Sequence, residues 1–240
     1  MSRVRRNRRR VLAVSRVFAL GPALAAGCAL ALVPGIAAGQ DVADIDYEHL
    51  SFRGIAPEWG YLWPNRVEET QSYGVRVDMG YMGPGLRITP SLMYWSSRWQ
   101  QGEVSEFSDR IAQLVAEQTG GAAPNLDLGT IEYRDIAIGV DAHVVWEVPF
   151  DLLTFGGLGL TAHVVDGDGP AINGTFVEDL LDSVEPGFNL HFGAEYPVTD
   201  RMRLYSVARY EVMPDFQYFQ IRTGWQFMFA PNAPGEGRND

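Results

Sequence analysis

FQIRTGWQFMF, residues Phe219 to Phe229, is the stretch of sequence that decides the fold. Its odd positions are apolar or β-branched, and its even positions are polar or small, with Met228 as the exception. Strict alternation with a period of two predicts a β-strand whose two faces meet different surroundings. Such a strand suits either the wall of a membrane barrel or the edge of a secreted β-sandwich. The remaining chain has to decide between them.

The first 39 residues predict a secretory signal peptide and therefore export through the Sec route. An arginine-rich start precedes an apolar run from Val17 to Ala38, and small residues stand before a cleavage point ahead of Gln40. The only cysteine, Cys28, lies within this leader. The mature chain is therefore expected to form no disulfide and no thiolate metal site.

The mature chain is strongly acidic. All 19 basic residues are arginines, and the 12 that follow residue 39 stand against 30 acidic residues, a formal charge of −18. Phosphate binding requires concentrated basic side chains, so nucleic acid is not an expected partner. No apolar stretch beyond the leader approaches the ~18 residues that a membrane helix needs. A membrane location would therefore require a closed barrel.

The alternation predicts one all-β domain of eight strands. We expect a periplasmic lead-in over 40–49, a barrel over 50–229 and a periplasmic tail over 230–240. Pro57 is expected to bulge or break the first strand, and the sequence leaves open whether the segment Trp59–Trp63 adds to the barrel. The expected strands cover residues 50–56, 73–82, 86–95, 131–148, a segment ending at 165, 188–196, 202–212 and 219–229.

Two long insertions separate the strands. The first, 96–130, carries apolar residues at helical spacing, and the second, 166–187, contains a Thr-x-x-Glu capping box that begins at Thr175. A helix is expected in each. Connections alternate between long and short from the first strand to the sixth, as in membrane barrels with long outer loops and short periplasmic turns. Residues 101–127 and 166–185 are therefore expected to face outward.

The polar strand faces mix arginines and carboxylates with glycines. This composition indicates a narrow interior that arginines span and in which carboxylates pair with them. The predicted polar lumen network consists of Arg53, Arg76, Asp78, Arg87, Asp141, His143, His163, His191, Glu195, Arg203, Arg209 and Glu211.

The apolar strand faces carry aromatic residues near the strand ends. A soluble sandwich would bury its aromatic residues in the middle of the packed face, whereas a membrane barrel places them at the two lipid–water interfaces. The expected girdle residues are Tyr73, Tyr81, Tyr94, Trp146, Tyr196, Tyr210 and Phe229.

Four residues of the last strand carry a family resemblance. Arg222, Gly224, Phe227 and Phe229 have polar-x-Gly-x-x-aromatic-x-aromatic spacing, which resembles the closing-strand signal of bacterial outer-membrane β-barrels. In strand count and loop rhythm the chain is similar to the OmpX and OmpA transmembrane-domain kind. The resemblance implies an eight-stranded antiparallel up-and-down transmembrane barrel in the outer membrane. It also implies outer-membrane lipid and the barrel assembly machinery as partners. Family members usually end at the final aromatic residue, whereas 230–240 follow here.

The three histidines of the mature strands are the candidates for chemistry. His143 and His163 are expected ~20 Å apart along the barrel, whereas His163 and His191 are placed to approach each other near the outer rim. A polar interior network is the favoured interpretation. The outer-membrane lipid A deacylases place a His-x-Ser pair on one strand, and none of these histidines is followed by that serine. No enzyme, cofactor or metal site is therefore expected.

The favoured function is a non-enzymatic structural or surface-interaction role through acidic extracellular loops. An eight-stranded lumen is filled by side chains, so free diffusion of solutes is not expected. The main alternative is a narrow channel or carrier for small hydrophobic molecules, resembling OmpW, with Trp59, Tyr61 and Trp63 near its mouth. A lipid-modifying enzyme and a soluble secreted binding barrel are further alternatives. The sequence identifies no ligand and no oligomeric state.

Overall fold

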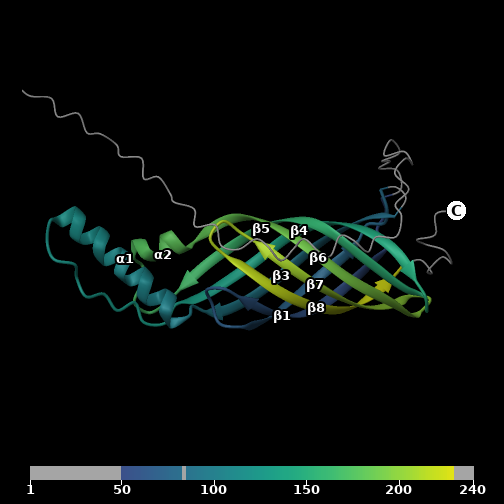
Figure 1. The fold of residues 1–240 in the computed structure, drawn as a ribbon, viewed down its shortest axis with the longest axis horizontal. Coiled ribbons are helices and arrows are strands. Elements are labelled where there is room, and N and C mark those ends of the chain that lie inside the picture. Colours follow the sequence, from purple (N-terminus) through teal and green to yellow (C-terminus); the bar gives the residue numbers. More distant parts are fainter. Residues whose placement is uncertain (1–49, 83–84, 230–240) are drawn as a thin grey trace, which may run out of the picture. The chain divides into compact units, whose positions relative to one another are not determined.

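The computed structural model describes residues 50–82 and 85–229, and the predicted leader, lead-in and tail lie outside the described residues. Eight antiparallel strands close into a barrel in which each strand pairs with its neighbours in sequence and the last pairs with the first (Figure 1). The elements are β1 (Gly54–Pro64), β2 (Thr70–Asp78), β3 (Leu86–Arg98), α1 (Gln101–Thr119), β4 (Glu132–Val148), β5 (Leu152–Asp168), α2 (Phe176–Leu181), β6 (Ser183–Thr199), β7 (Met202–Val212) and β8 (Gln217–Met228).

Neither helix in the described part of the chain is long and apolar enough to span a membrane.

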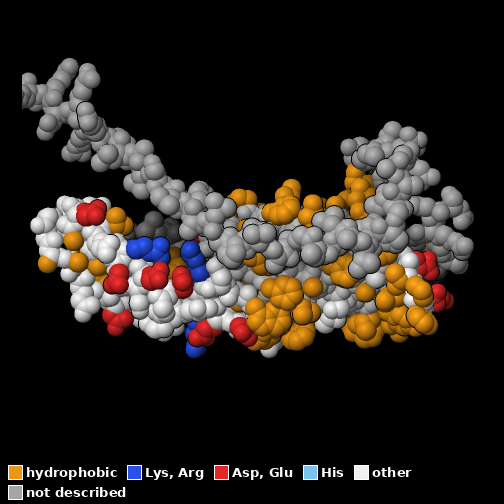
Figure 2. Space-filling model, viewed as in Figure 1, with side chains coloured by type: hydrophobic (Ala, Val, Ile, Leu, Met, Phe, Trp, Pro, Cys, Tyr) orange, Lys and Arg blue, Asp and Glu red, His pale blue; other side chains and the backbone are white. Residues whose placement is uncertain are grey.

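The apolar faces of the strands point outward. On β4, Ile138 is 57% exposed, whereas its neighbours on the opposite face, Asp135 and Asp141, are buried. Figure 2 shows hydrophobic side chains spread over the barrel surface. Water would disfavour such a surface, and lipid matches it. The expected eight-stranded transmembrane barrel is confirmed, and the alternative of a soluble barrel is wrong because its apolar face would point inward.

The first strand differs from its prediction. β1 continues through Pro57, so Trp59–Trp63 belong to it and add no further strand. Proline has no N–H to donate, and the β1–β8 pairing is interrupted at positions 56 and 57 but resumes in the same register. Because Pro57 remains paired with Val75 of β2, the strand does not break. The first connection is therefore only 65–69, and the expected alternation of loop lengths fails there.

The two ends of the barrel differ in their connections. One end, here called the helix end, carries 65–69, 99–131 with α1, 169–182 with α2, and 213–216. The other, here called the turn end, carries the connections β2–β3, β4–β5 and β6–β7, of which the last is only two residues long. Both predicted helices are present and lie at the same end (Figure 1). The long insertions therefore share one side of the barrel, as expected.

The short helix α2 begins with a variant of the predicted capping box. The Thr175 side chain accepts a hydrogen bond from the Val177 N–H at 3.2 Å, which is the usual cap contact. The Glu178 carboxylate accepts from the Gly174 N–H at 2.6 Å. Glu178 therefore binds the N–H of Gly174, the residue before the N-cap, instead of the N–H of the N-cap Thr175 itself. Both contacts fix the entry of the chain into α2.

Tyr81 is not part of an aromatic girdle. The Met79 N–H and the Gly80 carbonyl both bond to Ile88, and Gly80 has a φ of 78°, so two residues oppose one in a β-bulge. The extra residue reverses the alternation, and the Tyr81 side chain packs inward. It contacts the cluster here called the turn-end cluster, Val145, Leu153, Phe155 and Val207. The other predicted girdle residues are exposed: Tyr73, Tyr94, Trp146, Tyr196, Tyr210 and Phe229.

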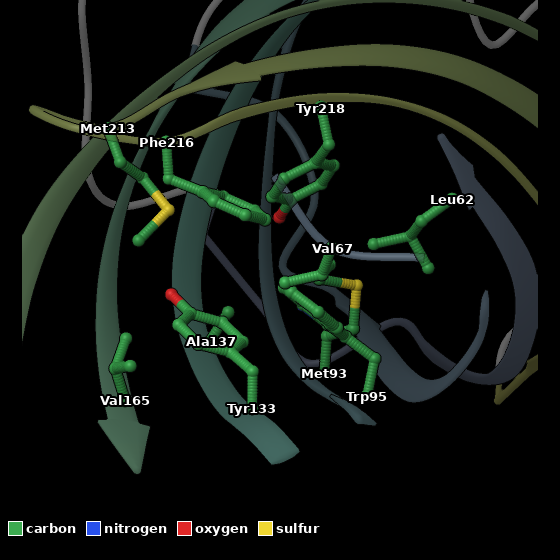
Figure 3. Packing of buried hydrophobic residues seen from close by; sticks show 10 residues of the cluster. All are labelled: Leu62, Val67, Met93, Trp95, Tyr133, Ala137, Val165, Met213, Phe216 and Tyr218. Carbon is green, nitrogen blue, oxygen red and sulfur yellow. The ribbon is translucent and has the colours of Figure 1, made fainter. Parts of the chain in front are cut away.

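Apolar clusters lie on either side of the polar interior. Toward the helix end, aromatic rings from β3, β4 and the β7–β8 connection stack inside the barrel. The ring centroids of Trp95 and Phe216 are 5.7 Å apart, and those of Tyr133 and Phe216 are 5.3 Å apart (Figure 3). We call this group the aromatic cluster. Its members are Leu62, Val67, Met93, Trp95, Tyr133, Ala137, Val165, Met213, Phe216 and Tyr218.

Gly157 marks a position where β4 and β5 leave no room for a side chain. A Cβ at Gly157 would overlap the Ala142 carbonyl oxygen, whereas a Cβ at Gly156 would meet its nearest neighbour, Phe192 Cδ2, at an ordinary 3.5 Å. Gly157→Ala should therefore destabilise the barrel, by about 1–3 kcal/mol for an overpacked site. Urea unfolding of the mature protein refolded in detergent measures this loss. Gly156→Ala is the matched control, and equal stability of the two variants would contradict the argument.

Candidate functional site

The polar side chains inside the barrel form the candidate site. The structure places one predicted member elsewhere: Arg53 precedes β1, is partly exposed, and lies 5.4 Å from the centre of the Tyr81 ring. Glu58, which the prediction omitted, is buried and joins the network. It was missed because Pro57 was expected to end the strand before it. The buried predicted members are Arg76, Asp78, Arg87, Asp141, His143, His163, His191, Glu195, Arg203, Arg209 and Glu211.

Glu195 on β6 is the centre of the turn-end half of the network. Arg87 donates to both of its carboxylate oxygens, at 2.8 and 2.6 Å, and Arg76 donates to Oε1 at 2.9 Å. Arg203 Nη1 lies 3.6 Å from Oε2. Since three strands supply these arginines and a fourth supplies the carboxylate, the ion pairs link opposite sides of the barrel wall.

Further contacts hold Arg76 in place. Gln226 accepts from Arg76 at 2.7 Å and donates to Asp78 at 2.9 Å. The Arg76 guanidinium stacks over the Tyr205 ring at 3.6 Å. Tyr205 in turn donates its hydroxyl to Glu58 at 2.6 Å. Each buried charge therefore has a charged or polar partner, as burial requires.

The first and last strands are joined by an ion pair. Arg222 on β8 donates to Glu58 on β1 at 2.8 Å, and both side chains are buried. The interrupted pairing at Pro57 lies directly beside Glu58. The ion pair thus connects the neighbouring strands β1 and β8 inside the lumen, next to the point where their backbone pairing is interrupted.

The helix-end half of the network centres on Arg209. Its guanidinium donates to Asp141 and, at 3.3 Å, to Glu211. His163 Nδ1 lies 2.7 Å from Asp135 Oδ2, and its Nε2 lies 3.6 Å from Glu211 Oε1. His163 therefore lies between two carboxylates.

The histidine pairing differs from the prediction. His143 and His191 are the adjacent pair, with ring centroids 4.7 Å apart, and the expected approach of His163 to His191 is wrong. The register explains this difference, because His143 and His191 are both opposite Gly157 of β5. His163 is six residues further along β5, opposite Glu185.

The four residues of the closing-strand pattern divide between the two faces. Arg222 lies in the lumen, and Gly224 provides space, since a Cβ there would come within 2.5 Å of the Tyr205 hydroxyl. Phe227 and Phe229 face outward and are 44% and 56% exposed. The Phe229 N–H donates to the Arg53 carbonyl at 2.8 Å.

A closed barrel with an apolar exterior and a paired charged interior decides the architecture. The chain has the fold of a small bacterial outer-membrane β-barrel. No family model matches the sequence, and none of the curated proteins matches it.

Several solved structures of outer-membrane proteins are similar to this chain. Neisserial surface protein A is 13% identical, with a TM-score of 0.48, and the match covers 74% of this chain and 97% of that one. Ail, the attachment invasion locus protein of Yersinia pestis, is 8% identical, with a TM-score of 0.46, covering 75% and 99% of the two chains. A major outer membrane protein of Thermus thermophilus is 11% identical, with a TM-score of 0.40 over 74% and 99%.

Removing the carboxylate at the centre of the network should strongly destabilise the barrel. Glu195→Gln keeps the side-chain shape but leaves Arg76 and Arg87 without their shared anion, and breaking a buried pair in this way costs about 3–5 kcal/mol. Urea unfolding of the refolded protein in detergent gives the difference. Glu147→Gln, at an exposed acid of β4, is the control and should unfold like the wild type. A loss no larger than that of the control would show that the network does not hold the barrel together.

Proposed function

We propose that the protein is a non-enzymatic, non-conducting outer-membrane barrel that presents an acidic surface at its helix end to a cationic partner. The observation that carries the proposal is the filled lumen. Ion pairs cross the interior around Glu195 and Arg209, and the aromatic cluster lies between them and the helix end. A solute passing through the lumen would have to disrupt both the ion pairs and the aromatic cluster. We therefore look for the function on the exposed surfaces of the barrel.

The same contents argue against a carrier for small hydrophobic molecules. A carrier needs an apolar path or cavity that a ligand enters. The middle of this lumen instead contains, among the described residues, five buried arginines and six buried carboxylates. An apolar ligand offers such groups no hydrogen bonds, and entry would leave them unpaired. The segment Trp59–Trp63, expected near a mouth, lies within the barrel wall, and Trp59 and Trp63 are exposed on its outer surface.

The helix end is an ordered surface. α1 packs through Val104 and Ile111 onto an apolar core of its own, which also contains Ile172 and Val177 from the second insertion. The Ser108 hydroxyl donates to the Leu126 carbonyl and ties α1 to the chain that returns to β4. Two separate insertions thus support one another, and the surface they form is fixed by packing.

Exposed acids dominate this surface. α1 carries Glu106, Asp109 and Glu117 as exposed acidic residues and Arg110 as an exposed basic one, and Figure 2 shows acidic side chains, with some basic ones, at the end that holds the helices. The basic groups there are partly occupied: Arg134 binds Asp166 at 3.1 Å and Asp168 at 3.0 Å. A surface with an excess of one charge sign attracts partners of the opposite sign and steers their approach. A basic protein or peptide segment is therefore the proposed partner class.

Topology and export belong to the same proposal. Sec export of the chain, periplasmic termini and outward-facing insertions would place the acidic helix end outside the cell. Two of the three turn-end connections, 149–151 and 200–201, are short, and this supports the orientation, since periplasmic turns of outer-membrane barrels are short.

Binding of a lysine-rich peptide to the mature protein in detergent tests the acidic surface. Glu106→Gln, Asp109→Asn and Glu117→Gln combined should weaken binding and reduce its salt dependence, because attraction between exposed charges is screened by salt. Isothermal titration at two salt concentrations measures both effects. The matched control replaces three exposed turn-end acids, Glu147→Gln, Asp151→Asn and Asp200→Asn. If the control lost as much affinity, binding would follow net charge alone and the proposed surface would be wrong.

We also propose that the closing-strand residues act as the signal for assembly. Phe229 faces lipid, stacks on Phe52 with ring centroids 4.8 Å apart, and continues the pairing of β8 with β1. Burying a phenylalanine contributes only ~1.5–3 kcal/mol, which is too little to unfold a closed barrel. Phe229→Ala should therefore reduce insertion in cells by more than its stability loss in detergent implies.

Phe192→Ala provides the comparison for this effect. Phe192 on β6 is 56% exposed, the same as Phe229, and also contacts one aromatic neighbour, Trp146. Both variants should refold in detergent to similar extents, and only Phe229→Ala should lower the amount of folded protein in the outer membrane. Equal defects of the two variants in cells would mean that Phe229 acts only as a lipid-facing side chain.

A further inference from the structure

We propose that Asp141, His143 and His191 bind a single divalent transition-metal ion of the zinc type inside the lumen. The three side chains are buried, and one ligand atom from each lies within 4.8 Å of the others. They project from adjacent levels of β4 and β6 on either side of β5. Two imidazoles and one carboxylate form a ligand set that Zn²⁺ accepts, with one coordination position left for water.

The hydrogen bonds of His191 prepare it as a metal ligand. Its Nδ1 lies 2.7 Å from Asn189 Oδ1, and Asn189 Nδ2 donates to Asp141 at 3.2 Å, which fixes the orientation of the amide. Since the amide oxygen only accepts, the proton of the neutral His191 ring is on Nδ1. Its Nε2 then carries a lone pair. Metal-binding histidines are oriented by such a contact on the other nitrogen.

The Nε2 atom of His191 is the second observation that points to a ligand. It is buried and has no hydrogen-bond partner in the part of the chain that the structure describes. Gly157 lies opposite both histidines, and a Cβ there would come within 2.9 Å of this nitrogen. Nε2 therefore lies beside a position at which the strand carries no inward side chain.

The other two ligands can bind an ion without breaking their main contacts. One Asp141 oxygen accepts from Arg209, while the other has only the 3.2 Å contact with Asn189. The nitrogens of His143 have long contacts, 3.3 Å to Arg87 and 3.2 Å to Thr89. Arg87 keeps its two shorter bonds to Glu195 when the His143 contact is exchanged.

The distances between the ligand atoms permit the ion. Bonds of about 2.0–2.2 Å place tetrahedral ligand atoms about 3.5 Å apart, so the cluster has to contract by roughly 1 Å. The closed wall implies that the ion enters while the barrel folds.

Zinc content of the mature protein tests the proposal. The chain is refolded in detergent with excess Zn²⁺, freed of loose metal by dialysis, and analysed by elemental mass spectrometry. One zinc per folded chain is expected, whereas zinc-free folded wild type would overturn the proposal whatever the variants do. Refolding with Co²⁺ should give the visible absorption of a four-coordinate nitrogen and oxygen site.

Variants assign the ion to its ligands. His191→Gln should remove the bound zinc and the Co²⁺ absorption, and Asn189→Leu, which leaves the three ligands in place, should weaken affinity about 10–100-fold. The matched control is His163→Gln, because His163 is a buried lumen histidine outside the cluster. Heat-modified gel migration confirms folding of each variant. Zinc lost equally from His163→Gln, or retained in full by His191→Gln, would place the metal elsewhere.

Discussion

The rest of the structure depends on the pairing of charges inside an apolar wall. A barrel of eight strands in lipid has no bulk water inside it, so an unpaired interior charge carries a large desolvation cost. Glu195 meets this constraint by accepting from two arginines, with a third close by, and Arg209 meets it by donating to two carboxylates. These contacts connect strands far apart in sequence, so the charged interior specifies which strands face one another.

The sequence predicted the barrel because its signals are local. Alternation with a period of two identifies strands such as β7, whose predicted and observed bounds agree. The inward positions of Arg76, Arg87 and Glu195 followed from the same alternation. What failed required non-local information. Pro57 was read as a strand end because its missing donor is visible in sequence, while its intact pairing with β2 is not. Tyr81 was misplaced because a bulge at Gly80 reverses the alternation.

The histidines show where sequence reasoning reaches its limit. Counting residues from the β4–β5 turn correctly separated His143 from His163 along the barrel axis. The register of β5 against β6 could not be counted in this way, because a long insertion whose fold was unknown lies between these strands. That register places His191 level with His143. The cluster therefore depends on the registers of three neighbouring strands, which together set the shear of the barrel and cannot be read from one strand alone. The proposed function is still less local, because the helix-end surface is formed by two separate insertions that pack against each other.

The ion pair between Glu58 and Arg222 has a consequence for the order of events in folding. Its partners belong to the first and the last strand, so neither charge has this partner until the barrel closes. A closure slipped by two residues would keep the apolar faces outward but leave the carboxylate opposite the wrong neighbour. Backbone pairing of β1 with β8 is interrupted at positions 56 and 57, next to this ion pair. The buried pair thus favours the observed register of β1 against β8 over a register shifted by two residues.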